Sequence, residues 1–430
     1  MKRVLLLATT TGYQTRSFDE AAVRLGVELV FGLDRCRQLD NPWGDRALAV
    51  RYYDDPRSVD AIVSAARDGA ISGVLALGDQ PTVLAARAAR VLGLPFHSPE
   101  SAAASRNKLV TRERLRGAGL PVPWFAAADA AADPHILARQ VPFPCVVKPL
   151  ALSGSRGVIR ADGAAAFVAA FERLRRILQA PDVRTMKDPA LQEILVERFI
   201  PGVEFAVEGL MHHGTLQVLA VFDKPEPLDG PFFEETMYVT PSAAAAQTQQ
   251  RITDAIVGAC AALGLRHGPV HAECRVNPDG VFVLEVAARP IGGLCARALR
   301  MTDGNAPVVP FEELLLRHAL GEEVRGWRRE PCASGVMMIP IPRGGVYRGV
   351  RGEDRARAVR LVEEVLITAK PDQHLVPLPE GASYLGFAFA RGDSGREVLN
   401  ALREVHGHLA FQIDRELPIA APAPVSPAQR

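Results

Sequence analysis

Short apolar segments alternate with amphipathic segments near the N-terminus, and this alternation constrains the fold more than any other feature of the chain. The expected strands cover residues 4–8, 27–31 and 71–77, and the expected helices, the first opened by a serine cap, cover residues 17–25, 58–67 and 81–92. Strands that alternate with helices in this way indicate a parallel, doubly wound sheet. The segment "GDQP" follows the last of these strands, at the sheet edge where ligands bind in open α/β folds.

Beyond residue 100 the pattern changes to α+β. A helix over residues 105–117 leads into a region in which we expect a hairpin that turns at residues 277–280. After residue 330, strands and a helix over residues 394–406 predict a small α+β lid, and the Pro/Ala-rich end predicts a disordered tail. The expected units are an N-terminal domain, a central domain, a lid domain and the tail, over residues 1–100, 101–325, 326–417 and 418–430.

Composition excludes several classes of protein. The formal net charge is +1, which gives no electrostatic reason to expect a nucleic acid or an anionic membrane as a partner. No apolar run approaches the roughly 20 residues of a membrane span, and residues 4–8 are too short for the apolar core of a signal peptide. The cysteines are scattered, which argues against a zinc site or a disulfide framework and favours the cytoplasm; they are Cys36, Cys145, Cys260, Cys274, Cys295 and Cys332.

A lysine followed by a small-residue loop is the first constellation that carries chemistry. Lys148 ends an expected strand, and Ser153, Gly154, Ser155 and Gly157 follow it. Small residues allow the backbone N–H groups of a loop to close around phosphate oxygens, and a lysine adds positive charge. An ordinary hairpin with flexible glycines is the alternative. The P-loop and dinucleotide-binding patterns are absent from the sequence, which disfavours those nucleotide-binding classes.

Two further constellations contain pairs of glutamates. Glu197 and Glu204 flank a Pro-Gly turn, which suits an adenine hinge followed by a carboxylate for a ribose; solvated glutamates on a surface hairpin are the alternative. Glu273 and Glu285 lie on either side of the expected turn at residues 277–280 and can face the same side. Two neighbouring carboxylates repel unless they share a cation, for which Mg²⁺ is suited; a salt-bridged strand edge is the alternative.

Together these constellations resemble those of the ATP-grasp superfamily, and the resemblance covers essentially the whole chain. "LEVAARPIGG" and "LPEGASYLGFAFARG" carry a finer similarity to the carboxylate–amine ligases that include bacterial L-amino acid ligases and carnosine synthase. The resemblance implies an ATP-grasp fold of α/β and α+β class. Its N-terminal domain would be Rossmann-like (pre-ATP-grasp), and its C-terminal lid a small α+β domain like the C-terminal subdomain of biotin carboxylase.

The resemblance also implies roles for individual residues. Arg289 would bind the carboxylate that is activated, and Glu273 and Glu285 would ligate Mg²⁺, for which Mn²⁺ is a possible substitute. Gly292 and Gly293 would leave space for the substrate. The ATP-binding residues would be Lys108, Lys148, Ser153, Gly154, Ser155, Gly157, Glu197, Arg198, Phe199 and Glu204.

One position departs from the family pattern. Many ATP-grasp enzymes place an asparagine ligand two residues after the second metal-binding glutamate, where this chain has Ala287, so the number of bound ions stays open. In the loop over residues 227–243, Glu234, Glu235 and Tyr238 would border the amine-substrate pocket, with an exposed acidic loop as the alternative. Lys224 could contact the phosphates or cover the active site, and a solvated lysine in a surface loop is the alternative.

The implied reaction joins a small-molecule acid and an amine. ATP would convert the acid into an acyl phosphate, and the amine would then displace phosphate to give an amide. Glu273, His271 and a phosphate oxygen are each possible acceptors of the amine proton. Two alternatives stay open, which are a different acceptor amine (a peptide, a nucleotide precursor or a secondary-metabolite fragment) and an ATP-binding protein without ligase activity. The resemblance further makes a homodimer through the N-terminal region plausible.

Overall fold

The computed structural model describes residues 1–9, 14–34, 47–53, 55–305 and 307–415. The N-terminal strands form a parallel sheet of order β3-β2-β1-β4, which confirms the doubly wound arrangement. Its strands are β1 (Arg3–Ala8), β2 (Glu28–Leu33), β3 (Ala47–Ala49) and β4 (Gly73–Leu77), and its helices are α1 (Thr15–Leu25), α2 (Asp55–Arg67) and α3 (Thr82–Leu92). The expected serine cap is wrong, because α1 begins earlier, after Gln14, whose side chain caps nothing.

Two helices replace the single helix expected over residues 105–117. They are α4 (Pro99–Arg106) and α5 (Lys108–Gly117). Asn107 separates them because its backbone is extended (φ −96°, ψ 110°) and its side-chain oxygen accepts hydrogen bonds from the N–H groups of Leu109 and Val110. Asparagine is among the residues that best cap a helix N-terminus. The break places Lys108 at the first position of α5.

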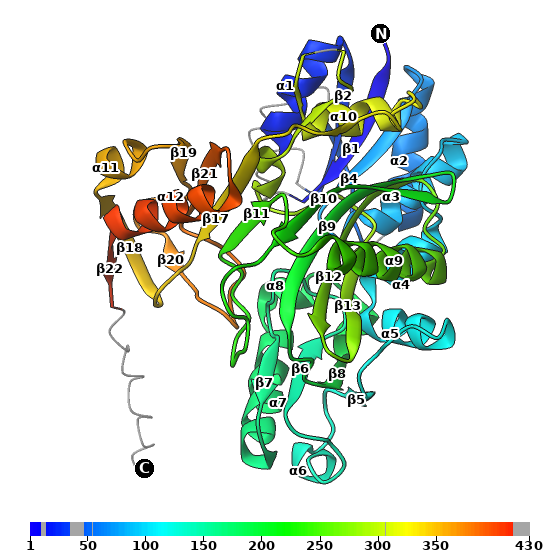
Figure 1. Ribbon diagram of the computed structural model, residues 1–430. Coiled ribbons are helices and arrows are strands. Elements are labelled where there is room, and N and C mark those ends of the chain that lie inside the picture. The colour runs from blue at the N-terminus through cyan, green and yellow to red at the C-terminus, as the bar shows by residue number, and fades with distance from the viewer. Residues whose placement is uncertain (10–13, 35–46, 54, 306, 416–430) are drawn as a thin grey trace, which may run out of the picture.

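A small antiparallel sheet of order β5-β8-β6-β7 lies at the lower end of the molecule in Figure 1. Its strands are β5 (Phe125–Asp129), β6 (Cys145–Pro149), β7 (Ile159–Ala161) and β8 (Glu193–Arg198), and it is accompanied by α6 (Pro134–Leu137), α7 (Ala164–Leu178), α8 (Pro181–Arg184) and η2 (Pro189–Gln192). Phe167, Phe171 and Leu174 recur at helical spacing along α7 and are buried in the core beneath this sheet.

The largest sheet runs through the centre of the molecule in the order β13-β12-β9-β10-β11-β17-β21-β19. Its strands are β9 (Val203–His212), β10 (Thr215–Asp223), β11 (Met237–Thr240), β12 (Gly268–Asn277), β13 (Gly280–Ala287), β17 (Ala333–Ile339), β19 (Val362–Ile367) and β21 (Gly386–Gly392), and α9 (Ala246–Leu263) packs on it. Because β11 pairs with β17, the sheet continues across residue 326, where we expect a domain boundary.

The C-terminal region has the expected α+β character and lies to one side of the molecule (Figure 1). It adds β18 (Gly345–Arg351), β20 (His374–Leu375), β22 (Ala410–Asp414), α11 (Glu353–Arg357) and α12 (Gly395–His408). The hydroxyl of Ser394 accepts a hydrogen bond from the N–H of Glu397 and so caps α12. The expected disordered tail at residues 418–430 lies outside the described residues.

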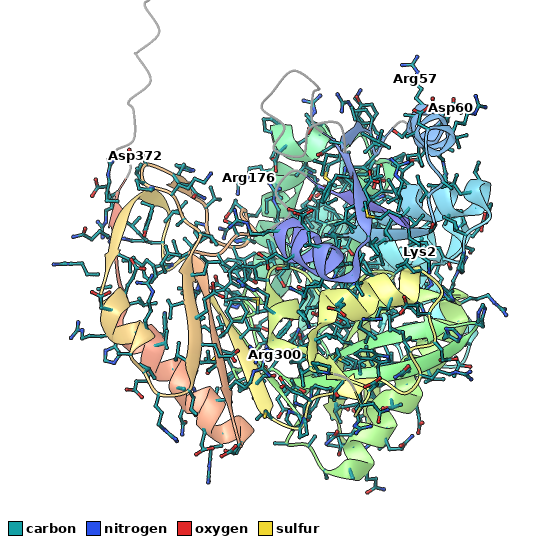
Figure 2. The ribbon with its side chains drawn as sticks, turned by 90° about the horizontal axis from the view of Figure 1, so that it is seen from above. Lys2, Arg57, Asp60, Arg176, Arg300 and Asp372 are labelled. Carbon is teal, nitrogen blue, oxygen red and sulfur yellow. The ribbon has the colours of Figure 1, made fainter. Side chains whose placement is uncertain are left out.

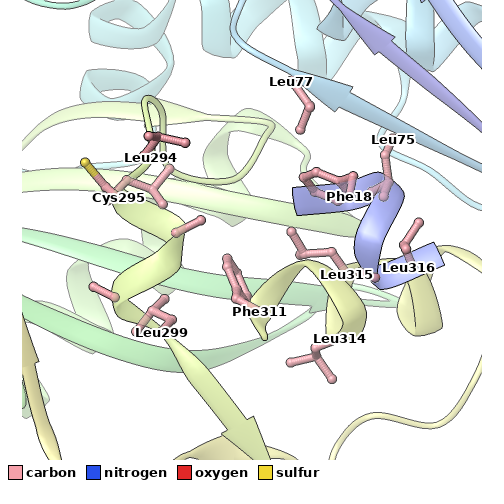
Figure 3. Packing of buried hydrophobic residues seen from close by; sticks show 14 of the residues in the cluster. Phe18, Leu75, Leu77, Leu294, Cys295, Leu299, Phe311, Leu314, Leu315 and Leu316 are labelled. Carbon is pink, nitrogen blue, oxygen red and sulfur yellow. The ribbon is translucent and has the colours of Figure 1, made fainter. Parts of the chain in front are cut away.

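An apolar core joins the N-terminal sheet to the central sheet. α10 (Phe311–Ala319) and η3 (Cys295–Ala298) accompany a small sheet formed by β14 (Arg300–Thr302), β15 (Val309–Pro310) and β16 (Arg328–Arg329). Figure 3 shows Phe18 of α1 and Leu75 of β4 beside Phe311 and Leu315 of α10. Burial of a large apolar side chain contributes about 1.5–3 kcal/mol, so these contacts hold the two sheets together firmly.

Charged side chains lie around the outside of the molecule. Figure 2 shows Arg57 and Asp60 on α2, and Asp372 in the C-terminal region, pointing outward. No helix in the described part of the chain is long and apolar enough to cross a membrane.

Candidate active site

One cavity of about 390 Å³ collects most of the residues singled out from the sequence. Its walls come from the end of β4, the loop after β6, the β8–β9 turn, the β12–β13 hairpin and the C-terminal region. Cavities of this size are typical of small-molecule sites. The lining includes Lys108, Lys148, Ser153, Gly154, Ser155, Glu197, Phe199, Glu204, Glu235, Tyr238, Glu273, Glu285, Arg289, Gly292 and Gly293.

Glu273 and Glu285 are direct cross-strand partners in the β12–β13 hairpin. Such partners project on the same face of a sheet, so both carboxylates face the cavity. A β-bulge between Glu273 and Cys274 sets this pairing, because the register of the turn alone would pair Glu273 with Leu284. The ammonium of Lys108 lies 3.4 Å from Glu285 and donates a hydrogen bond of 2.8 Å to the carbonyl of Leu152. Oxygen donors of this kind suit Mg²⁺, so the residues present fit the ion that the fold family uses.

Lys224 lies at the centre of a group of carboxylates. Its ammonium is 2.8 Å from Glu204, 2.6 Å from Glu235 and 3.0 Å from Glu273, and the side chain is buried. Burial alone would lower the pKa of Lys224, but the three carboxylates outweigh it and raise the pKa well above 10.5. Lys224 is therefore not the solvated lysine of the alternative interpretation. Glu204 is also paired with Arg275 at 2.8 Å.

The electrostatic surroundings keep Glu273 ionised. Burial alone would raise its pKa, but Lys224 and His271 outweigh burial and lower the pKa well below 4.5. Glu235 responds in the opposite way, because burial and the nearby charge of Glu273 raise its pKa to about 7. Its carboxylate accepts a hydrogen bond of 2.6 Å from the hydroxyl of Tyr238.

His271 lies between two carboxylates. Its Nδ1 is hydrogen-bonded to Glu208, which is fully buried, and its Nε2 is 3.4 Å from Glu273. Burial alone would lower the pKa of His271, but Glu208 outweighs it and raises the pKa to about 9. The raised pKa of His271 makes this side chain poorly suited to transfer a proton from the amine to other groups.

The side chain of Glu197 belongs to a buried group of ion pairs beside the expected adenine hinge. Its carboxylate accepts a hydrogen bond of 2.9 Å from Arg112 and forms an ion pair with Lys148, and all three side chains are buried. Burial alone would raise the pKa of Glu197, but Arg112 and Lys148 lower it to about 2. The side chain of Glu197 thus holds Lys148 in the cavity wall, and only its backbone is available to a hinge.

Aromatic rings line the cavity beside the β8–β9 turn. The rings of Phe199 and Phe233 stack with centroids 6.3 Å apart, and the guanidinium of Arg275 lies 5.1 Å from the centre of the Phe199 ring. A flat apolar wall of this kind suits a planar base.

Arg289 forms a two-pronged ion pair with Asp79, at 2.8 Å and 3.1 Å. A further N–H of Arg289 donates a hydrogen bond of 3.0 Å to the carbonyl of Pro290. A guanidinium has five N–H groups, so two remain for another acceptor. Asp79 belongs to the "GDQP" segment, which therefore meets the hairpin end at the cavity.

Three of the predicted site residues lie outside the lining of this cavity, and their roles stay predictions. Arg198 is exposed at the end of β8, and its N–H donates to the carbonyl of Trp124. Gly157 donates its N–H to Pro379 and packs beside Leu174. Glu234 lies next to Glu235 in the sequence but is not among the residues that line the cavity.

Three family models match the chain. They are the ATP-grasp domain over residues 141–298, the ATP-grasp N-terminal domain over residues 19–96 and the L-amino acid ligase C-terminal domain 2 over residues 337–414. The crystal structure of an L-amino acid ligase from Bacillus licheniformis is similar to this chain, with a TM-score of 0.81 and 27% identity over 96% of this chain and 99% of that one. The chain belongs to the ATP-grasp family of ligases.

Two curated relatives match a smaller part of the chain than this structure does. D-alanine–D-alanine ligase B of Chromobacterium violaceum is 26% identical over 54% of this chain and 72% of its own length. Carnosine synthase 1 of Gallus gallus is 28% identical over 67% of this chain, but the chain spans only 32% of that protein. Together with the L-amino acid ligase structure, these relatives indicate a carboxylate–amine ligase of the ATP-grasp family.

Sequence reasoning missed several residues of the site. Arg112 and Glu208 are buried within helix and strand patterns that read as ordinary amphipathic segments, and no local signal distinguishes them. For Asp79, the only indication of a role in the site is its position directly after an expected strand. Ala287 is buried and pairs with His271 across the hairpin, so it offers the cavity no ligand atom.

Proposed function

We propose that this ligase uses ATP to join a carboxylic acid to an amine through an acyl phosphate, releasing ADP and phosphate. The observation that carries the proposal is the cross-strand pair Glu273 and Glu285 in one cavity with Lys108, Lys148 and Arg289. Two carboxylates suited to a divalent cation thus lie beside three cationic side chains. Phosphoryl transfer needs mainly positioning and neutralisation of charge, which this arrangement offers.

ATP would bind in the part of the cavity between the β8–β9 turn and the loop after β6. Phe199 and Phe233 offer the wall for adenine, and Glu204 offers a carboxylate for the ribose hydroxyls. Lys148 and the loop Ser153–Ser155 face the phosphates. Glu197 acts as a positioning residue because it fixes Lys148. Mg²⁺, held by Glu273 and Glu285, would neutralise phosphate charge when it is bound.

The acid half assigns Arg289 to the substrate carboxylate. Asp79 fixes the guanidinium and leaves two N–H groups of Arg289 to donate to the acid and to the oxyanion that forms from it. Gly292 lines the cavity, and a side-chain carbon added there would meet no atom within 4 Å. This open space beside Arg289 fits the body of the acid substrate.

The amine half assigns Glu235 and Tyr238 to the second substrate. Both face the cavity near Glu273, and a carboxylate there attracts a substrate ammonium. The ammonium must lose a proton before its nitrogen attacks the acyl carbon. Glu235, with a pKa of about 7, joins Glu273 and a phosphate oxygen as a possible acceptor, whereas the raised pKa of His271 disfavours it.

Amino acids are the substrates that we propose, with a dipeptide as product. Support comes from the names of the similar proteins, an L-amino acid ligase and a D-alanine–D-alanine ligase. We further propose that Mn²⁺ substitutes for Mg²⁺, that the protein acts in the cytoplasm, that it is a homodimer through its N-terminal region, and that its domains cover residues 1–100, 101–325 and 326–417.

Phosphate release tests the proposal. Purified protein with ATP and Mg²⁺ should release phosphate from a panel of amino acids only when an acceptable acid and amine are both present. Glu285→Ala should abolish this release, whereas Glu404→Ala, which changes a carboxylate that is 62% exposed on α12, should leave it unchanged. ATP binding without phosphate release on every substrate pair would favour a non-catalytic nucleotide-binding protein instead.

A further inference from the structure

A second group of ionisable side chains lies away from the cavity, where α10 approaches the central sheet. His212 ends β9, His267 precedes β12 and His318 lies in the last turn of α10. One ring nitrogen from each of these three histidines lies within 4.8 Å of the other two. None of the three lines the proposed active site. We call this group the histidine cluster.

The nitrogens of the histidine cluster lack the hydrogen bonds that buried polar atoms normally have. His267 and His318 are 6% and 1% exposed. Both ring nitrogens of His267, Nδ1 of His212 and Nε2 of His318 are buried without a hydrogen-bond partner in the described part of the chain. Buried polar groups almost always have hydrogen-bond partners. Four unpartnered ring nitrogens in one place therefore indicate a ligand that accepts several nitrogen lone pairs at once.

The rings also have the protonation state that a metal requires. Burial lowers the pKa of His267 to about 4, and burial together with the neighbouring histidines lowers the pKa of His318 to about 3. Neutral imidazole is the form that coordinates a metal ion. The rings of His267 and His318 stack with centroids 4.3 Å apart, a contact between like groups that their neutral state permits.

We propose that His212, His267 and His318 bind a Zn²⁺ ion. Three imidazoles and one open position are an established ligand set for zinc, with Zn–N distances of roughly 2.0–2.1 Å. Tetrahedral geometry at that distance separates ligating nitrogens by about 3.3 Å, so the stacked rings of His267 and His318 would rotate on binding to direct their in-plane lone pairs at one ion. The scattered cysteines argued against zinc, but the histidines come together only in the folded chain.

The site would link two parts of the fold. α10 packs against α1 and β4 of the N-terminal region, and a side-chain carbon on Gly73 of β4 would lie 2.5 Å from the carbonyl oxygen of Ala319 at the end of α10. His212 and His267 belong to the central sheet and its connection. An ion held by all three histidines therefore ties α10 to that sheet. His212 is half-buried, and this gives the ion a route from solvent.

Zinc content of the full-length protein tests this inference. Protein stripped with a chelator is dialysed against a low concentration of Zn²⁺ with excess Mg²⁺, which occupies oxygen-ligand sites, and its metal is counted by mass spectrometry. Wild-type protein should retain one equivalent of zinc, and its unfolding midpoint should rise when zinc is present. Replacement of Zn²⁺ by Co²⁺ should give the visible absorption bands of a cobalt ion bound by nitrogen ligands.

Matched variants separate this site from other zinc-binding groups. His212→Gln and His318→Gln should weaken zinc binding by at least about tenfold, whereas His135→Gln, which changes an exposed histidine on α6, should not. If His318→Gln does not fold, the half-buried His212 keeps the test valid. Absence of retained zinc would overturn the inference, as would equal binding by the His212 variant or a loss of zinc in Cys332→Ser, since Cys332 is an exposed thiol. None of these outcomes depends on ligase activity.

Discussion

Replacing Glu197 by glutamine tests whether this carboxylate is a buried counter-ion. Glu197 is 3% exposed and is paired with Arg112 and Lys148, which are 1% and 7% exposed. Glutamine keeps the shape of the side chain but removes the charge. Two buried cations would then lie together without their shared anion.

The expected loss of stability is large. Breaking a buried ion pair by removing one partner costs about 3–5 kcal/mol, because the remaining charge is buried without compensation. The loss also has a pH signature. Since the pKa of Glu197 is lowered from 4.5 to about 2, its contribution is complete at neutral pH and is lost as the pH falls through 2. The difference between wild type and Glu197→Gln should therefore shrink below about pH 4.5.

Urea unfolding at pH 7 measures this difference. Glu380→Gln is the matched control, because Glu380 also forms a two-pronged pair with an arginine, Arg173, but the two side chains are 42% and 36% exposed. That control should lose less than about 1 kcal/mol. If Glu197→Gln lost no more than the control, the carboxylate would not be the counter-ion that holds Lys148, and the reasoning would be refuted.

Three further predictions concern the cavity and its loop. Asp79→Asn should raise the KM for the acid by about tenfold through loss of the fixed guanidinium of Arg289, with the KM for ATP nearly unchanged in the same steady-state assay. Gly157→Ala should cost about 1–2 kcal/mol in thermal unfolding, because the residue has a φ of +75° and its new carbon would lie 2.7 Å from Leu174, whereas Gly163→Ala, with no atom within 4 Å, should be nearly neutral. EDTA should abolish phosphate release, and Mg²⁺ or Mn²⁺ should restore it; activity that persists in EDTA would contradict the roles of Glu273 and Glu285.

Local features of the structure were predictable from the sequence. The hairpin of β12 and β13 follows from the turn at residues 277–280, but the pairing of Glu273 with Glu285 does not, because it depends on a β-bulge between Glu273 and Cys274. The parallel N-terminal sheet follows from the alternation of strand and helix. The break at Asn107 was missed, although asparagine caps helices well, because the apolar pattern continues on both sides of it.

Contacts between distant segments were not predictable in the same way. Asp79 and Arg289 meet although 210 residues separate them, and nothing near either residue names the other. The sequence assigned Glu197 to a hinge because it precedes the Pro-Gly turn, and nothing near it indicates that the pairing of β8 with β6 directs its side chain toward Lys148. The histidine cluster likewise combines residues from a strand end, a loop and a helix end.

Transfer of an oxygen isotope tests the central claim most directly. The acid substrate, identified from the amino acid panel, is labelled with ¹⁸O in its carboxylate and turned over with ATP, Mg²⁺ and the amine. The released phosphate is then analysed by mass spectrometry. An acyl phosphate intermediate predicts one ¹⁸O atom in each phosphate formed, because the bond between the acyl carbon and that oxygen breaks when the amine attacks. Phosphate without the label, formed together with the amide, would contradict the account.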